Sequence, residues 1–177
     1  MVLSDGELFE AIANGHLVIA PFDDDNVQPS SIDLRLDPLL TVQRRNPVPG
    51  MTLHPDALNV AEHISLYAEE KVDLSGGQTW NFEPGRFIIG QTLETVGLPL
   101  DLAGRVEGRS RLARLGLGVH VTAPKIDPGF RNRITLEMFN LGPWTIGLTA
   151  NMRICSLVVE RLGRAAQGGY QGAFQGS

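Results

Sequence analysis

The fold of this chain is decided by Glu107-Gly-Arg-Ser-Arg-Leu-Ala-Arg-Leu-Gly116, followed by Val121-Thr-Ala-Pro-Lys-Ile-Asp-Pro-Gly129 and Ile134-Thr-Leu-Glu137. The first stretch places three arginines and a serine within six residues. Asp127 then falls on a predicted Pro-Gly turn, and Glu137 on a predicted strand. Arginine forks bind phosphate oxygens and a carboxylate can transfer protons, so the combination predicts a site for an anionic ligand with acid–base chemistry at its other end.

The charge of the chain is unevenly distributed. The net charge over 177 residues is −5. Residues 105–133 carry seven basic side chains against two acidic ones, a net +5, which leaves −10 for the rest of the chain. A positive basin in an acidic chain suits a small, highly charged anion, so we expect binding neither to nucleic acid nor to a membrane surface.

The cysteine count and the hydropathy pattern give the expected compartment. Cys155 is the only cysteine and lies in an apolar run, so it is expected to be a small buried hydrophobe rather than half of an intramolecular disulfide. There is no signal sequence and no apolar run of about 18 residues. We therefore expect a soluble cytoplasmic protein.

The chain reads as one mainly β domain over residues 1–177 with a short N-terminal helix and one or two small helices. Ser4 and Glu7 have capping-box spacing, and Gly15 is a helix stop. Short apolar segments separated by glycine and proline then predict strands. These are Leu17–Ala20, Ile32–Leu36, Leu40–Arg44, Trp80–Phe82, Phe87–Leu93, Gly104–Glu107, Gly118–Val121, Arg133–Phe139, Trp144–Leu148 and Arg153–Glu160. Residues 46–77 are expected to be an irregular excursion, and residues 163–177 a flexible C-terminal lid.

The candidate residues each have a structural alternative. A short helix is predicted at Ser110–Leu115, ended by Gly116, and it could simply be a solvated basic turn. Alternation places Glu137 on the polar face of its strand, where a glutamate is often only solvated. Asp127 before Pro-Gly is also ordinary turn chemistry. The four histidines and single cysteine form no zinc-ligand pattern, and no H-x-E with P-C-x-x-C, Walker P-loop or G-x-S-x-G motif is present.

Together, these motifs resemble the dCTP deaminases, zinc-free members of the trimeric dUTPase superfamily. The resemblance extends over about residues 2–161 and is strongest in the central block quoted above. It includes Val27-Gln-Pro-Ser-Ser-Ile-Asp-Leu-Arg-Leu36, Phe82-Glu-Pro-Gly-Arg-Phe87 and Gln91-Thr-Leu-Glu-Thr-Val-Gly-Leu-Pro99. It implies a distorted dUTPase-like β-barrel (β-clip or jelly-roll-like), a homotrimer with shared active sites, and Mg²⁺ bound through the nucleotide triphosphate with no metal ligand from protein side chains.

The resemblance also assigns site residues. It implies that Glu137, Ser110 and Arg114 are catalytic. The implied nucleotide-binding residues are Arg109, Ser110, Arg111, Leu112, Ala113, Arg114, Ala123, Asp127, Thr135, Leu136, Glu137, Tyr170 and Gln171. The chain departs from the family pattern at Arg111, at Pro124-Lys125 and in its shortened tail.

The resulting hypothesis is hydrolytic deamination of dCTP to dUTP and ammonia, with dTTP as a candidate inhibitor. One alternative is a bifunctional enzyme that continues to dUMP, or a plain dUTPase, in which Asp127 directs a water at phosphorus. A second alternative, from another class, is a non-catalytic nucleotide-binding regulatory trimer. A nucleic-acid-binding role is disfavoured by the acidic remainder of the chain.

Overall fold

The computed structural model describes residues 1–43, 52, 54, 56, 62 and 68–172. Its helices in this part of the chain are α1 (Asp5–Ala13), the 3-10 turn η1 (Asp24–Asn26) and α3 (Ser110–Ala113). Its strands, in chain order, are β1 (Val18–Ala20), β2 (Val27–Gln28), β3 (Ser31–Arg35), β4 (Leu39–Gln43), β5 (Ala68–Asp73), β6 (Trp80–Phe82), β7 (Phe87–Gly97), β8 (Leu102–Gly108), β9 (Leu117–Gly118), β10 (Lys125–Ile126), β11 (Arg131–Asn140), β12 (Ile146–Leu148) and β13 (Arg153–Arg161).

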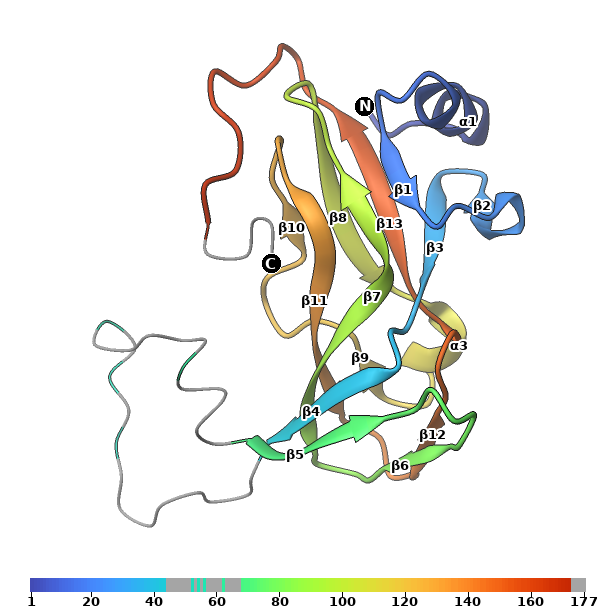
Figure 1. Cartoon of the computed structure of the whole chain (residues 1–177), viewed down its shortest axis with the longest axis vertical. Helices are drawn as coiled ribbons and strands as arrows, with labels where there is room; N and C mark the ends of the chain where they lie inside the picture. Colours follow the sequence, from blue (N-terminus) through green and yellow to red (C-terminus); the bar gives the residue numbers. More distant parts are fainter. Residues whose placement is uncertain (44–51, 53, 55, 57–61, 63–67, 173–177) are drawn as a thin grey trace.

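Among the described residues, the strands form two larger antiparallel sheets and one small ribbon. The first sheet has the order β5-β4-β7-β11-β9, with β1 also paired to β7, and the second has the order β10-β8-β13-β3-β2. The ribbon pairs β12 with β6 at one end of the molecule (Figure 1). The predicted mainly β, distorted barrel-like architecture is confirmed, with the strands divided between sheets instead of forming one continuous closed sheet.

Helix α1 begins and ends as its sequence predicts. The Ser4 hydroxyl accepts the Glu7 backbone N–H, and the Glu7 carboxylate accepts the Ser4 backbone N–H at 2.9 Å, which satisfies two helix-start donors. These hydrogen bonds hold the pKa of Glu7 below its usual value. Gly15 has a φ of 75°, a left-handed conformation in which glycine is favoured, so the chain leaves the helix there and enters β1.

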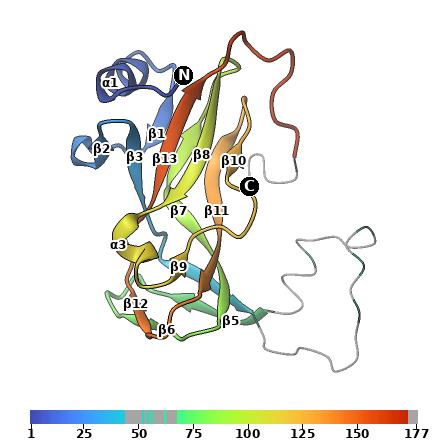
Figure 2. The same cartoon turned by 180° about the vertical axis from the view of Figure 1, so that it is seen from behind.

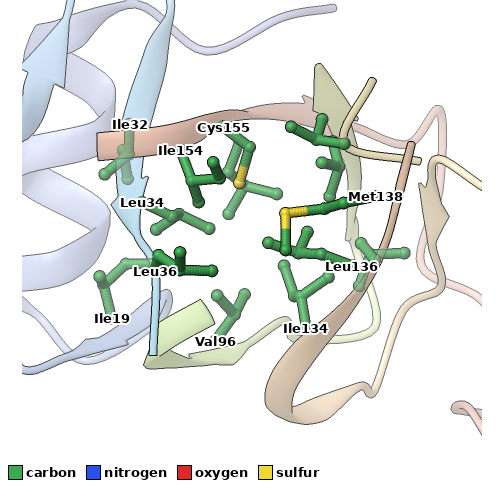
Figure 3. Packing of buried hydrophobic residues seen from close by; sticks show 14 of the residues in the cluster. Ile19, Ile32, Leu34, Leu36, Val96, Ile134, Leu136, Met138, Ile154 and Cys155 are labelled. Atoms are coloured by element: carbon green, nitrogen blue, oxygen red, sulfur yellow. The ribbon is translucent and has the colours of Figure 1, made fainter. Parts of the chain in front are cut away.

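The core lies between the two larger sheets (Figure 3). The labelled side chains come from β1, β3, β7, β11 and β13 and from Leu36 just after β3, and buried residues of β8 belong to the same cluster. Leu34, Leu136 and Cys155 are each completely buried. Burial raises the pKa of the Cys155 thiol, and the side chain packs as a small hydrophobe, as predicted.

Strand β3 and the residues that follow it, as far as Asp37, alternate core residues with charged residues. Ile32, Leu34 and Leu36 are buried apolar side chains. The intervening charged positions, Asp33, Arg35 and Asp37, point to the other face, where each forms an ion pair with a residue distant in sequence. This strand therefore contributes both to the core and to a row of buried or partly buried charges.

Two local predictions were wrong. The strand expected at Gly118–Val121 is limited to Leu117–Gly118, and residues 119–124 carry no strand assignment. Val119 still points into the core, but Val121 is exposed and Pro124 cannot donate to a strand ladder. The irregular segment expected at 46–77 contains β5, whose largely charged sequence shows no apolar alternation by which it could be recognised. The remainder of that segment lies largely outside the described residues.

The other predicted strands are present, with shifts at their ends. β7 extends to Gly97 and β8 begins at Leu102, both longer than the sequence indicated. The last residue of the predicted strand Leu40–Arg44 lies outside the described residues. In the part of the chain that is described, no helix is long and apolar enough to cross a bilayer.

Candidate active site

The polar face of β11 forms one wall of a cavity of about 200 Å³. Thr135 and Glu137 line this cavity, while Ile134, Leu136 and Met138 on the opposite face have their side chains in the core. The alternation read from the sequence is therefore confirmed. The lining is Val106, His120, Ala123, Lys125, Ile126, Asp127, Phe130, Arg133, Ile134, Thr135, Leu136, Glu137 and Tyr170.

Glu137 is partly buried in the cavity wall. Removal from water disfavours its charged form, and this burial raises the pKa of the Glu137 carboxyl above its ordinary value of 4.5. A hydrogen bond from its own backbone N–H and the nearby His120 oppose that shift. A carboxyl with a pKa raised towards neutrality can both accept and return a proton, which general acid–base catalysis requires.

Asp127 lies on the turn that leads into β11. Its carboxylate forms an ion pair with Lys125 at 2.7 Å, and its carbonyl accepts the Phe130 N–H. Gly129 in the same turn has a φ of 80°, a conformation that favours glycine. The turn therefore fixes Asp127 at the β11 entrance, facing the cavity that contains Glu137.

The C-terminal segment contacts the same turn. The Tyr170 N–H donates to the Pro128 carbonyl at 2.7 Å, and the Tyr170 and Phe130 rings meet edge to face with centroids 5.5 Å apart. A second cavity of about 480 Å³ lies between this segment and the turn, lined by residues that include Lys125, Asp127 and Gln171. Tyr170 lines both cavities, so the segment forms part of the wall of the site. The last residues of the predicted lid, 173–177, lie outside the described residues.

The arginine-rich run 109–114 forms a separate basic surface. Its helix α3 is anchored by the buried side chain of Leu112. Arg109 pairs with the buried Asp33 at 3.1 Å, whereas Arg111 and Arg114 are exposed. The run turns at Gly116, with a φ of 95°, where an added Cβ would collide with the Gly142 backbone.

The structure brings together only part of the predicted site. Ala123, Asp127, Thr135, Leu136, Glu137 and Tyr170 line one cavity, and Gln171 is beside it. Within one chain, the run Arg109, Ser110, Arg111, Leu112, Ala113 and Arg114 does not line that cavity. Figures 1 and 2 place α3 on the side of the molecule opposite the C-terminal segment. A single chain therefore places the predicted site residues in two separate groups, one at the cavity and one at α3.

Several cavity residues were missed from the sequence. His120 lines the cavity, and its Nδ1 is buried without a hydrogen-bond partner in the described structure. His120 lies three residues before the predicted contact Ala123, in Val119-His-Val-Thr-Ala123, and this position is a signal by which it could have been found. Arg133 shares the polar face of its strand with Glu137, as the alternation predicts, but no role in the site was predicted for it from the sequence. Phe130 follows the Asp-Pro-Gly turn and gave no signal of its own.

The described residues contain no group of three or more His, Cys, Asp or Glu side chains placed to hold a metal ion. The oxygen-rich triphosphate of a nucleotide is itself a suitable Mg²⁺ ligand.

The structure is thus that of a mainly β protein with a strand carboxylate in a small cavity and an arginine-rich helix on another part of the chain. The chain belongs to the dCTP deaminase-like family, whose model matches residues 2–162. The family and enzyme class that the sequence motifs predicted are thus confirmed.

Similar proteins span the whole chain. A "dCTP deaminase, dUMP-forming" from Rhodococcus jostii is 42% identical over 177 residues, which is 100% of this chain and 89% of the relative. A "dCTP deaminase" from Haloarcula marismortui is also 42% identical, covering 100% of this chain and 88% of the relative. The crystal structure of 2'-deoxycytidine 5'-triphosphate deaminase from Agrobacterium tumefaciens superposes with a TM-score of 0.71 at 26% identity. That match covers 92% of this chain, which spans 49% of the length of the solved chain.

Proposed function

We propose that this protein is a dCTP deaminase that hydrolyses the C4 amino group of dCTP without zinc. The observation that carries the proposal is the position of Glu137, whose carboxyl is partly buried in a small cavity and has a raised pKa. Membership of the dCTP deaminase-like family supports cytosine as the base that faces it.

Glu137 can perform both proton transfers of the reaction. Glu137 accepts a proton from water as the water oxygen adds to C4 of the cytosine ring, and it passes that proton to N3. The carboxylate then takes the proton of the new C4 hydroxyl and delivers it to the C4 amino group, so the C–N bond breaks and ammonia leaves as the C4 carbonyl forms. One carboxyl can both accept and donate these protons because burial raises the pKa of Glu137 above that of an exposed glutamate.

The nucleoside is proposed to lie along the cavity wall. Thr135 and Leu136 flank the base beside Glu137, Ala123 contacts the nucleoside in the same cavity, and Asp127 binds the sugar. The segment carrying Tyr170 and Gln171 is proposed to act as a lid that excludes bulk water from the reacting atoms.

The second half of the site is proposed to come from another copy of the chain in a homotrimer. The exposed residues Ser110, Arg111 and Arg114 face solvent in one chain, where they are available to a neighbouring cavity. Leu115, Leu141 and Trp144 are exposed apolar side chains on the adjoining segments, and Leu141 donates its N–H to the Gly116 carbonyl. An apolar surface beside a basic one fits a contact between copies better than a free surface.

In that assembly, Ser110 and Arg114 are proposed to position the attacking water and stabilise developing charge. The basic run 109–114 supplies the phosphate contacts. Mg²⁺ is proposed to be held by triphosphate oxygens, where it neutralises phosphate charge. The affinity gained at the phosphates aligns the base with Glu137.

The product is proposed to be dUMP and pyrophosphate, formed by hydrolysis of the dUTP that deamination generates. The sequence alone favoured dUTP as the final product. The names of the Rhodococcus relatives favour the dUMP-forming reaction, and these relatives match over the whole chain. Asp127 at the junction of the two cavities is the residue we assign to the water that attacks phosphorus.

Incubation of the purified protein with dCTP and Mg²⁺ tests both parts of this proposal. Ammonia, dUTP, dUMP and pyrophosphate are measured over time, for wild type and for Glu137→Gln. Ammonia with dUMP as the accumulating product supports the dUMP-forming reaction, while ammonia with stable dUTP rejects that part only. Tight dCTP binding without ammonia release from either protein would favour a regulatory nucleotide-binding trimer. Addition of dTTP to the same assay tests inhibition.

A further inference from the structure

Arg133 and Asp127 are opposite charges that line the same cavity without pairing to each other. Both residues belong to its lining, yet no ion pair joins them among the residues described by the structure. Each is neutralised by a different residue: Asp127 pairs with Lys125 at 2.7 Å, and Arg133 pairs with Asp37 at 2.7 Å. The cavity therefore keeps a carboxylate and a guanidinium available to a polar group placed between them.

Asp37 is a fixed anchor for the guanidinium. Its side chain is 4% exposed, and its two oxygens have separate partners. Oδ2 accepts from Nη1 of Arg133, and Oδ1 accepts the Leu39 N–H at 3.0 Å. The Asp37 N–H in turn donates to the Gln91 carbonyl at 2.9 Å, so the backbone that carries Asp37 is also held.

Arg133 retains unused donor capacity. A guanidinium has five N–H donors in a planar fork, and the interaction with Asp37 uses the Nη1 side. The Arg133 side chain is 44% exposed, so its remaining N–H groups can reach a ligand. Anchoring one side of the fork reduces the rotamer freedom that the arginine loses when a ligand binds.

The position of Arg133 along β11 indicates which part of the nucleotide it meets. Arg133 and Glu137 are four residues apart on one face of the strand, about 13 Å along it. Asp127 lies on the turn immediately before the strand, so Arg133 is at the Asp127 end of the cavity. On the proposed function, on which this inference rests, that is the sugar end.

We propose that Arg133, held by Asp37, is a specificity-determining residue that donates a hydrogen bond to the sugar 3′-hydroxyl of the nucleotide. A hydroxyl offers one hydrogen and two acceptor lone pairs. Asp127 accepts its hydrogen, and Arg133 donates to its oxygen, so the two opposite charges recognise one group from both sides. Removal of the hydroxyl from the ligand leaves both charges without that partner.

A double-mutant cycle between protein and ligand tests this proposal. kcat/KM is measured for ammonia release from dCTP and from 2′,3′-dideoxy-CTP, with wild type, Arg133→Gln, Arg133→Lys and Arg131→Gln. Arg131→Gln is the matched control because Arg131 is exposed on the same strand and does not line the cavity.

Arg133→Gln is expected to lower kcat/KM for dCTP by about tenfold or more, as for loss of one charge-assisted hydrogen bond. The same substitution should change kcat/KM for 2′,3′-dideoxy-CTP by less than about twofold, because that substrate has no 3′-hydroxyl to accept the hydrogen bond. Arg133→Lys should recover part of the loss, and Arg131→Gln should affect both substrates equally. An equal loss for both substrates with Arg133→Gln overturns the proposal and leaves Arg133 a purely structural residue.

Binding separates this proposal from the proposed function. Calorimetric dissociation constants for dCTP and dideoxy-CTP are measured in a Glu137→Gln background, where no turnover is needed. A selective loss of dCTP affinity with Arg133→Gln supports the inference even if the wild-type protein released no ammonia. Equal affinities for the two ligands in the Arg133-containing protein would overturn it. Thermal unfolding of each variant confirms that the compared proteins are folded.

Discussion

The guanidinium of Arg109 lies 3.1 Å from the buried carboxylate of Asp33, which joins the start of α3 to strand β3. Asp33 also accepts the Ser156 hydroxyl at 2.7 Å, and Arg109 donates to the Arg153 carbonyl at 3.2 Å. Four positions further along the chain, just beyond β3, Asp37 holds Arg133 at the cavity that Glu137 lines. This segment thus positions one arginine at the start of α3 and one at the cavity.

Asp33→Asn should loosen the attachment of Arg109 and the start of α3. The amide keeps the size of the side chain but loses the charge that holds Arg109. We expect the free energy of unfolding to fall by about 1–3 kcal/mol, typical for a hydrogen bond to a charged group, and KM for dCTP to rise. Urea unfolding and steady-state kinetics measure the two effects. Asp24→Asn, at an exposed position, is the control. If the two variants behaved alike, Asp33 would not position the arginine.

Glu137→Gln should remove proton transfer while preserving the shape of the cavity. We expect ammonia release to fall by about 10²–10⁴-fold, with dCTP binding retained. In the wild-type protein, the carboxyl must be ionised to accept a proton from water. Because burial raises the pKa of Glu137 above 4.5, the acid limb of kcat/KM should lie above that pH. A rate that is flat with pH from 4 to 8 would contradict the assignment of Glu137 as the base.

The same carboxyl should couple stability to pH. The pKa of Glu137 is higher in the folded chain than in the unfolded chain, so between these two pKa values the folded chain binds more protons. Its contribution to stability is therefore present below pH 4.5 and is lost as the pH rises through the folded pKa. Glutamine does not ionise, so Glu137→Gln does not lose this contribution as the pH rises. The melting temperature of the variant minus that of wild type should therefore be larger at pH 7 than at pH 4. A relative stability that decreases between these two pH values would show that the carboxylate is stabilised in the fold.

Local patterns predicted the local parts of this structure. The Ser4 capping box gave α1, and alternation along β11 gave the polar face that carries Glu137. The Asp37–Arg133 pair could not be read in the same way, because its partners are 96 positions apart and meet only through the order of the strands. The separation of α3 from the cavity also depends on the order of the strands: residues 109–114 and 137 are close in sequence, yet they belong to different elements of the fold.

Burial, rather than bond length, should determine the strength of ion pairs in this protein. Arg35 and Glu94 meet at 2.6 Å with Glu94 only 1% exposed, and Arg105 and Glu107 meet at the same distance with Glu107 48% exposed. Glu94→Ala leaves Arg35 without its carboxylate and should cost about 3–5 kcal/mol. Glu107→Ala should cost less than about 1 kcal/mol. Chemical denaturation of both variants measures the difference, and equal losses would refute the dependence on burial.

The contact between the C-terminal segment and the turn that carries Asp127 should support turnover of dCTP. Alanine substitutions at two glycines provide a matched test. Gly129 and Gly77 both have a φ of 80°, so alanine at either position introduces similar backbone strain, about 1–2 kcal/mol. Only at Gly129 would the new Cβ meet another segment, at 2.6 Å from the Gly169 Cα, whereas at Gly77 it meets nothing within 4 Å. Gly129→Ala should therefore displace the segment that carries Tyr170 and raise KM or lower kcat for dCTP, while Gly77→Ala should leave the kinetics near those of wild type. Unfolding measurements report the backbone strain that both variants share. If kcat and KM changed equally in Gly129→Ala and Gly77→Ala, the packing of the C-terminal segment on the turn would not be needed for catalysis.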